Sequence, residues 1–205
     1  PGDRKKNEAL IHNIFFPMRK DSSEVSDHDV WLLSEEYHYY DYIASDKPLS
    51  QIKIGGEMLF EEEIDERVNE FLGRMSEENK AVRPDIALFH EEGAVVIVEF
   101  KAPGISLDNH FGDLVEYATL LAAMSKGKLR KFYGYLIGDK INSARLGSYK
   151  PLPGAKGWFD TIDIREPQTQ VGIGQLYSEL LYYDDIVERS RKRIGVYRDR
   201  LKLPN

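Results

Sequence analysis

The clearest hydrophobic pattern along the chain is a pair of apolar runs separated by a short polar turn. The first run covers residues 84–89, the second covers 94–101, and the linker between them includes His-Glu-Glu-Gly. Runs of this length, rich in Val, Ile and Phe, are typical of buried strands, and a linker this short favours an antiparallel hairpin. If Phe89 pairs with Val95, the register of the hairpin places Asp85 directly opposite Glu99.

Other periodicities predict the rest of the architecture. Apolar residues spaced by three or four predict helices over 28–44, 58–73 and 111–125. Continuous apolar runs predict strands over 131–139 and 175–183. The stretch 140–174 is rich in Gly and Pro and predicts loops with short strands, and Asp184 is expected to cap a last helix that runs to about residue 201. Strands interleaved with helices predict an α/β fold, with a mixed central sheet flanked by helices.

Charged residues lie inside the second apolar run, where a buried strand normally has none. Alternate side chains of a strand share a face, so Glu99 and Lys101 point one way while Val98 and Phe100 point the other. In the expected register, the Cβ atoms of Asp85 and Glu99 are about 5 Å apart. Two facing carboxylates repel each other, and a divalent cation between them offsets this repulsion.

Carboxylate oxygens in this arrangement suit Mg²⁺ or Mn²⁺, which bind one or two carboxylates and keep several waters. Lys101 beside such a cation would orient or deprotonate the attacking water, or stabilise the developing negative charge. The three residues Asp85, Glu99 and Lys101 therefore predict metal-assisted hydrolysis of a phosphodiester.

The amino-acid composition narrows the class of protein further. The chain has 205 residues, 41% of them hydrophobic, which is ordinary for one large globular domain. The absence of Cys excludes disulfides and Cys-based metal sites or nucleophiles, and no apolar run reaches about 18 residues. We therefore expect no membrane partner and a cytoplasmic location. The five histidines have no metal-ligand spacing and are interpreted as surface or packing residues.

A net charge of −7 means that any contact with nucleic acid must be local. Basic residues gather near the C-terminus, over 188–202. The residues expected to bind phosphates along one helix face are Arg189, Lys192, Arg193 and Arg200. The alternative interpretation is a solvated helix face or a docking surface for another domain.

The segment RPDIALF…VVIVEFKAPG resembles the core motif of the PD-(D/E)XK nuclease superfamily. The matching residues are Pro84-Asp85, a spacer of thirteen residues, and Glu99-Phe100-Lys101. The resemblance implies a restriction-endonuclease-like core in which Asp85, Glu99 and the backbone carbonyl of Phe100 bind Mg²⁺ or Mn²⁺. It implies a metal-dependent endonuclease domain that hydrolyses DNA, in bacterial defence against phages or plasmids. A catalytically silent nucleic-acid-binding or regulatory module of a multidomain ATPase stays open as the alternative.

The resemblance extends to the flanking regions. Residues 13–50 and 180–201 resemble parts of the C-terminal nuclease domain in large bacterial ATP-binding proteins, whose N-terminal part is an ATPase of the histidine-kinase and chaperone type. This implies an ATPase domain elsewhere on a longer chain, with residues 1–27 as a leading segment and 28–205 as the nuclease-like domain. It also implies that Glu35 is the first-helix acid of the site, with Glu63 or Glu66 as alternatives. Because cutting both strands needs two sites, we expect a homodimer or larger assembly.

The helix expected after the hairpin departs from the superfamily pattern. Many members carry a Gln near a Tyr there, whereas the matching run here reads DLVEYA. Asp113 occupies the Gln position and Tyr117 the aromatic one. Since an ionised Asp cannot donate a hydrogen bond, Asp113 is expected to bind the metal or a bridging water, and Glu116 is the alternative.

Overall fold

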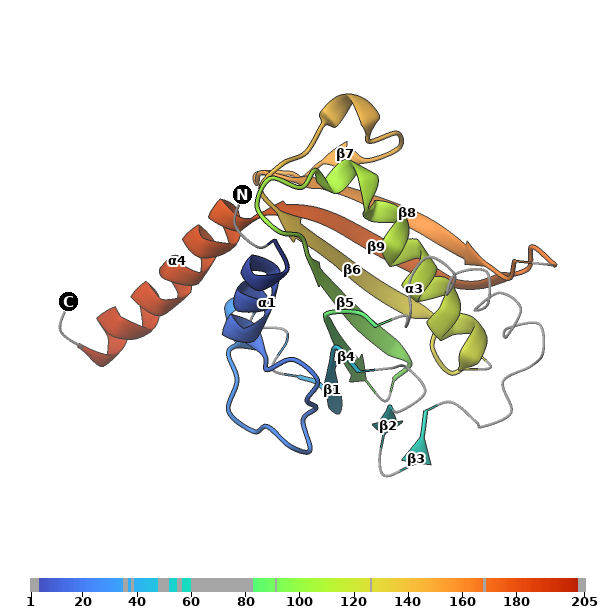
Figure 1. The fold of residues 1–205 in the computed structure, drawn as a ribbon, viewed down its shortest axis with the longest axis horizontal. Helices are drawn as coiled ribbons and strands as arrows, with labels where there is room; N and C mark the ends of the chain where they lie inside the picture. Colours follow the sequence, from blue (N-terminus) through green and yellow to red (C-terminus); the bar gives the residue numbers. More distant parts are fainter. Residues whose placement is uncertain are drawn as a thin grey trace.

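A computed structural model describes residues 4–34, 37, 39–47, 52–54, 57–59, 83–90, 92–125, 127–167 and 169–202. Within these residues the chain forms an α/β fold with an open, mixed sheet of seven strands and three α-helices (Figure 1). The expected α/β class and the mixed central sheet are confirmed.

The sheet combines antiparallel and parallel neighbours. Its strands are β1 (Tyr42–Ser45), β4 (Ile86–His90), β5 (Ala94–Phe100), β6 (Lys131–Gly138), β7 (Lys150–Pro151), β8 (Trp158–Arg165) and β9 (Gly172–Tyr182). Their order across the sheet is β1-β4-β5-β6-β9-β8-β7. The pairs β5–β6 and β6–β9 are parallel, and all other neighbours are antiparallel. A separate two-stranded ribbon consists of β2 (Lys53–Ile54) and β3 (Glu57–Met58).

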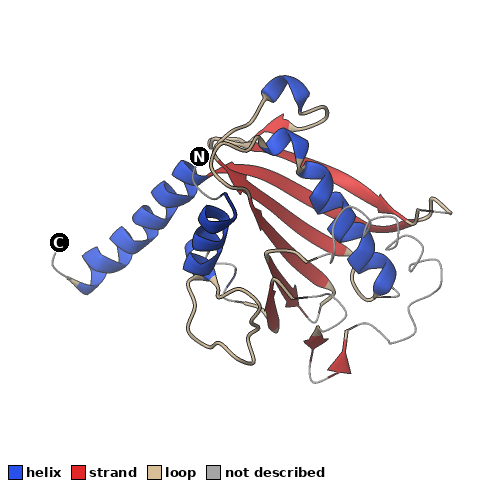
Figure 2. Ribbon diagram, in the orientation of Figure 1, coloured by secondary structure: helices blue, strands red, loops and turns tan. Residues whose placement is uncertain are grey.

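Helices cover both faces of this sheet. The α-helices are α1 (Arg4–Phe15), α3 (Phe111–Met124) and α4 (Tyr183–Leu201), and the short 3₁₀ helices are η1 (Val30–Leu32), η4 (Leu107–Asn109) and η5 (Ser143–Arg145). Strand alternation sends Ala87 and Phe89 into the core beneath α3, and Ile86 and Leu88 into a second core with α1 and η1. Figure 2 shows α3 lying across the sheet and α4 extending away from the body. The two cores thus lie on opposite faces of one sheet.

The β4–β5 hairpin has the expected register. Phe89 pairs with Val95, and the ladder continues to Ile86 and Val98 at the far end. A slip of one strand by one residue would exchange its side chains between the two cores and would move Asp85 away from Glu99. β5 then runs parallel to β6, with α3 between them in the chain.

Several predicted elements differ from the structure. The helix over 28–44 is wrong, because the described part of this segment forms η1 and then β1, which pairs with β4 along its whole length. Tyr42 and Ile43 favour a strand, and the pairing of this segment with β4 overrides the helical spacing. The helix over 58–73 is wrong at its start, since Met58 belongs to β3, and 60–73 lie outside the described residues.

The C-terminal half also contains more strand than expected. β8 is eight residues long and lies within the stretch interpreted as loops, where it pairs with β9. Asp184 does not cap α4: the helix begins at Tyr183 directly after β9, with Tyr182 at the N-cap position. Asp184 lies instead in the first turn, where its charge favours the positive end of the helix dipole.

The N-terminal segment belongs to the same packed unit as the sheet. α1 ends at Phe15, two residues before Pro17, and both Phe15 and Phe16 are buried in the core with η1 and β5. The expected boundary at residue 27 therefore does not coincide with a break in packing. No helix in the described part of the chain is long and apolar enough to cross a membrane.

Candidate active site

The C-terminal end of β5 brings two acids and a lysine into contact. The Nζ atom of Lys101 lies 3.1 Å from Oε1 of Glu99 and 3.0 Å from Oδ2 of Asp113. Lys101 directly follows β5, and its amide donates to the carbonyl of Ile137 on β6 at 2.9 Å. Asp113 comes from the first turn of α3. The parallel β5–β6 pair and the start of α3 thus fix the position of this cluster.

Asp85 joins the cluster from the end of β4. It precedes the first residue of β4, and extending the ladder by one pair places it opposite Glu99. The amide of Asp85 donates to Oε2 of Glu99 at 3.3 Å, and the amide of Phe100 donates to Oδ2 of Asp85 at 2.7 Å. These crossed hydrogen bonds hold the two carboxylates beside each other at the strand ends.

Burial and mutual repulsion control the charges of this pair. Burial raises the pKa of Glu99 to about 6, and the neighbouring Lys101 ammonium opposes this rise only in part. Burial and the charge of Glu99 also raise the pKa of Asp85. The two carboxylates therefore resist being ionised together, and a nearby cation would favour their ionised forms.

For Lys101, the neighbouring charges outweigh the effect of burial on the pKa. Burial by itself lowers the pKa of this ammonium, but the charges of Glu99 and Asp113 outweigh that effect and raise its pKa above the ordinary value. The side chain is only 12% exposed. Lys101 is thus a buried cation, protonated at neutral pH and held between two carboxylates.

Residues of α1 reach the same site and were missed by the sequence analysis. His12 is fully buried, with its Nε2 at 2.8 Å from Oγ of Ser45 and its Nδ1 at 3.7 Å from Oδ1 of Asp85. Burial lowers the pKa of His12 to about 4. The charge of Glu8, one helical turn earlier, contributes to the raised pKa of Asp85. The available signal was the spacing of four between Glu8 and His12, which places both on one helix face.

The side chains expected to support the site from α3 lie close to it. Tyr117 donates its hydroxyl to the carbonyl of Arg83 at 3.2 Å, just before Asp85. Burial raises the pKa of Tyr117, and the charges of Glu99, Asp85, Asp113 and Glu116 add to the rise. Asp113 also contacts His110, whose Nδ1 lies 3.1 Å from its Oδ2. In this arrangement Asp113 is a partner of Lys101, and Tyr117 packs beside the strand ends.

The donor atoms of the site determine how a metal could be held. Among the described residues, no three Asp, Glu or His side chains gather tightly enough to enclose a metal ion by themselves. A pair of carboxylates is nevertheless what Mg²⁺ uses when it keeps several waters, and Asp85 and Glu99 form such a pair with raised pKa values. The residues present therefore fit a cation held by two carboxylates and completed by waters.

Glu35, Glu63 and Glu66 lie outside the described residues. Phe100 is held at two points. Its amide donates to Asp85, and its ring stacks on Phe15 with the ring centroids 5.2 Å apart. This stacking anchors α1 against the strand that carries Glu99.

The basic residues of α4 do not share one environment. The guanidinium of Arg193 donates to backbone carbonyls at the end of η1, at 2.6 Å to Leu32 and 3.1 Å to Leu33. Arg189 pairs with Asp185 at 2.6 Å. Lys192 is 74% exposed and pairs with Glu188, and Arg200 is also exposed. Arg189 and Arg193 are half-buried and face the body of the protein, so the expected stripe is divided between this side and an exposed side.

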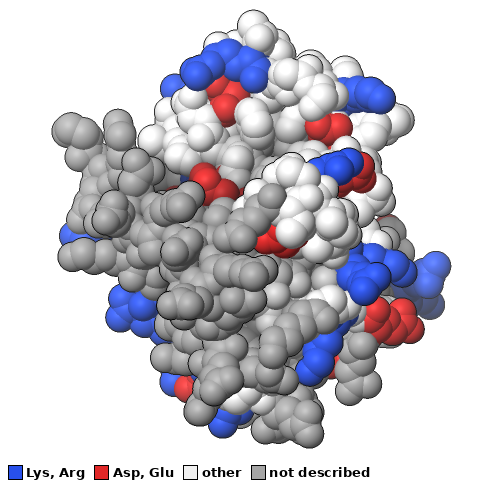
Figure 3. Space-filling model, turned by 90° about the vertical axis from the view of Figure 1, so that its right-hand side faces the viewer, with Lys and Arg blue, Asp and Glu red and all other residues white. Residues whose placement is uncertain are grey.

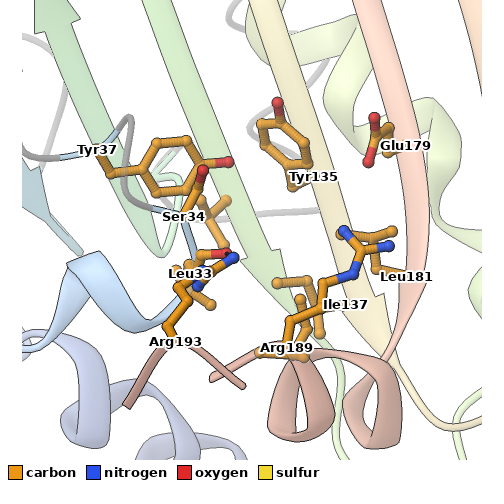
Figure 4. Close-up of a pocket in the computed structure, with 11 residues that line it drawn as sticks. Leu33, Ser34, Tyr37, Tyr135, Ile137, Glu179, Leu181, Arg189 and Arg193 are labelled. Atoms are coloured by element: carbon orange, nitrogen blue, oxygen red, sulfur yellow. Dashed lines mark hydrogen bonds between the residues drawn. The ribbon is translucent and has the colours of Figure 1, made fainter. Parts of the chain in front are cut away.

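A pocket of about 200 Å³ lies at the junction of α4 and the sheet, on the face opposite α3. Its polar lining residues are Ser34, Tyr37, Tyr135, Glu179, Arg189 and Arg193. Figure 4 shows Arg189 reaching from α4 toward Tyr135 and Glu179 on the strands. Glu99 and Lys101 do not line this pocket, because they point to the other face of β5.

Comparisons of the chain with protein-family models, curated proteins and solved structures find no match. Function is therefore inferred from the geometry of the site and from the sequence motif alone.

Proposed function

We propose that this chain is a metal-dependent nuclease domain of the PD-(D/E)XK type that hydrolyses phosphodiester bonds in DNA. The observation that carries the proposal is the pairing of Asp85 and Glu99 through crossed backbone hydrogen bonds, with Lys101 ion-paired to Glu99. The order of elements supports it, because the antiparallel hairpin is followed by a helix and then by a parallel strand. A restriction-endonuclease-like core requires this sequence of elements.

Within this proposal, Asp85, Glu99 and the carbonyl of Phe100 would hold Mg²⁺ or Mn²⁺. When bound, the cation supplies Lewis-acid stabilisation and an activated water. Glu8 on α1 acts on Asp85 electrostatically, and we propose it as a further candidate for the first-helix acid, beside Glu35, Glu63 and Glu66.

Lys101 acts as a fixed positive charge in this scheme. Because its pKa is raised by Glu99 and Asp113, Lys101 stays protonated and is a poor general base. It stabilises the negative charge that develops on the phosphate, and it orients water by donating hydrogen bonds. Asp113 holds the ammonium in place from α3.

The wider proposal places this domain in bacterial defence against phages or plasmids, on a chain that carries an ATPase, and working as a dimer or larger assembly in the cytoplasm. These parts rest on the sequence resemblance. Cleavage of DNA can be tested without them, because the described site residues all come from one chain.

The test is cleavage of supercoiled plasmid and linear DNA during a titration of Mg²⁺ or Mn²⁺. We expect metal-dependent cleavage that falls by about 100-fold or more in Glu99→Gln and in Lys101→Met, since each removes a group that acts in the transition state. Asp163→Asn is the matched control, because this acid is 66% exposed on β8 and is not part of the site. Undiminished cleavage by both site variants would contradict the proposal. DNA binding without cleavage at any metal concentration would favour the silent module.

A further inference from the structure

A groove lined by tyrosines crosses the face of the sheet opposite α3. Its aromatic lining consists of Tyr37, Tyr39, Tyr40, Tyr133 and Tyr135, and we call it the tyrosine groove. Val96 of β5 lies at its floor beside the two tyrosines of β6. The cavity volume is about 780 Å³, which lies within the range of about 300–1,000 Å³ that is usual for ligand sites.

The rings of the tyrosine groove are available to a partner. Tyr133 is 38% exposed although it lies in the middle of a sheet, and Tyr39 is 80% exposed at the border. The rings of Tyr37 and Tyr135 lie 5.7 Å apart, tilted by 59°. The hydroxyl of Tyr40 lies 2.5 Å from Nε2 of His28. The groove thus combines three rings that contact neighbouring rings or side chains with two exposed ones.

The charges that line the tyrosine groove are acidic. Asp41 and Glu92 are exposed carboxylates, His90 is half-buried, and the described lining contains neither Lys nor Arg. The nearest cation along β6 is Lys131, which strand parity places on the same face as Tyr133 but at the end of the strand. Phosphate groups would be repelled by this lining, whereas a cation would be attracted by the carboxylates and by the negative faces of the rings.

The tyrosine groove is separate from the carboxylate site. It lies near the hairpin turn, at the start of β5, whereas the carboxylates lie at the end of this strand. Val96 and Phe100 are four residues apart, which corresponds to about 13 Å along a strand. The two sites also lie on opposite faces of the sheet, so this inference does not rest on the proposed function.

We propose that the tyrosine groove binds a basic polypeptide segment of a protein partner. An arginine or lysine side chain of that segment lies against the exposed ring of Tyr133, and Asp41 and Glu92 pair with its charge. Cation–π contact and charge complementarity then act on the same group. Single-stranded nucleic acid, which also stacks on aromatic rings, is disfavoured because it needs a basic groove for its backbone.

The test is isothermal titration calorimetry of the protein with a (Gly-Arg)₃ peptide that is acetylated at its N-terminus and amidated at its C-terminus. A (Gly-Glu)₃ peptide and an oligothymidylate are the comparison probes. We expect saturable binding of the arginine peptide alone. Tyr133→Ala should weaken this binding by about three-fold to thirty-fold, the range of a cation–π contact, and Tyr133→Phe should retain it because the ring remains. Glu92→Gln should weaken it as well.

Lys131→Gln is the matched control, because it removes a charge at the end of the same strand face; binding of the arginine peptide should stay unchanged or become tighter. Circular dichroism and thermal unfolding of each variant separate loss of binding from loss of fold. The proposal is overturned if the arginine peptide binds the Tyr133→Ala and Glu92→Gln variants as tightly as the original protein, or if the peptide does not bind the original protein. Preferential binding of oligothymidylate in the groove would overturn it too.

Discussion

At the scale of single residues, the site is governed by the removal of charges from water. Glu99 is 8% exposed and Lys101 is its immediate ion-pair partner, yet the pKa of Glu99 is still raised to about 6. Burial therefore outweighs the attraction of one ammonium. Without metal, the folded protein binds a proton on Glu99 more readily than the unfolded chain does, so the free energy of unfolding depends on pH.

The stability contributed by Glu99 should fall as pH rises through the window from its ordinary pKa of 4.5 to its folded value of about 6. Glu99→Gln removes this dependence because an amide does not ionise. In the presence of a chelator, we expect the variant to gain about 2 kcal/mol in free energy of unfolding relative to the original protein between pH 4 and pH 7. Urea unfolding at a series of pH values measures the difference.

Added Mg²⁺ should reverse this order at pH 7, since the cation stabilises the ionised pair of Asp85 and Glu99, and the variant lacks one member of this pair. If Glu99→Gln is instead strongly destabilised at pH 7 without metal, Glu99 is a structural partner of Lys101, and burial of its charge does not govern the stability of the site.

At the scale of elements, the register of the β4–β5 hairpin decides whether Asp85 meets Glu99, and its turn contains a residue that only glycine suits. Gly93 has a φ of +81°, and a Cβ atom there would collide with the carbonyl oxygen of Lys128. Gly104 has a similar φ of +90° but nothing within 4 Å of the same position. The two glycines thus separate the effect of the backbone conformation from the effect of the collision.

We expect Gly104→Ala to lower the free energy of unfolding by about 1 kcal/mol, because it adds only the strain of a left-handed conformation. Gly93→Ala should cost about 2–4 kcal/mol, since overpacking against a backbone carbonyl is added to the same strain. Thermal or urea unfolding of both variants gives the comparison. Equal losses would mean that the hairpin turn moves aside without penalty.

The link between α4 and η1 is a second element-scale feature. Arg193 donates to the carbonyls that end η1, which a short 3₁₀ helix leaves without partners of its own. Arg193→Gln should therefore lower the free energy of unfolding by about 1.5–3 kcal/mol, the usual contribution of a hydrogen bond to a charged group. Arg200→Gln, an exposed site on the same helix, should change stability by less than about 0.5 kcal/mol. A stability loss shared equally by both variants would contradict this assignment.

At the scale of the whole molecule, the proposed function requires a protein with a net charge of −7 to bring DNA to a site that contains several carboxylates. On the face drawn in Figure 3, the Lys and Arg side chains of the described residues are interspersed with Asp and Glu. α4 extends away from the body, and Lys192 and Arg200 are exposed on it (Figure 1). Tyr183, at the start of α4, donates to the carbonyl of Lys101 at 2.8 Å, so the base of this helix adjoins the candidate active site.

If the exposed side of α4 binds DNA phosphates, the double variant Lys192→Gln and Arg200→Gln should weaken binding at low salt. The slope of log affinity against log salt concentration should decrease by about one unit for each phosphate that the variant no longer binds. Fluorescence anisotropy with a labelled duplex at several salt concentrations measures both quantities. Unchanged affinity and slope would mean that α4 faces another domain or solvent.

The sequence by itself determined the features that depend on local periodicity. The strand period of two placed Glu99 and Lys101 on one face, and the short turn indicated a hairpin in which Phe89 can pair with Val95. The spacing of three and four likewise located α3, and with it Asp113. Each of these features depends on residues that are close together in the sequence, and helix or strand geometry sets their relative positions once the element forms.

Tertiary structure alone decided which distant segments meet. It brought His12 of α1 to Asp85, and it converted the expected helix around Tyr42 into an edge strand, because β4 offered a partner for its backbone. It also placed the guanidinium of Arg193 against the carbonyls at the end of η1, although the sequence predicted that Arg193 binds DNA phosphates. Burial and long-range contact set these outcomes, since the free energy of a buried polar group depends on partners that lie far away in the sequence.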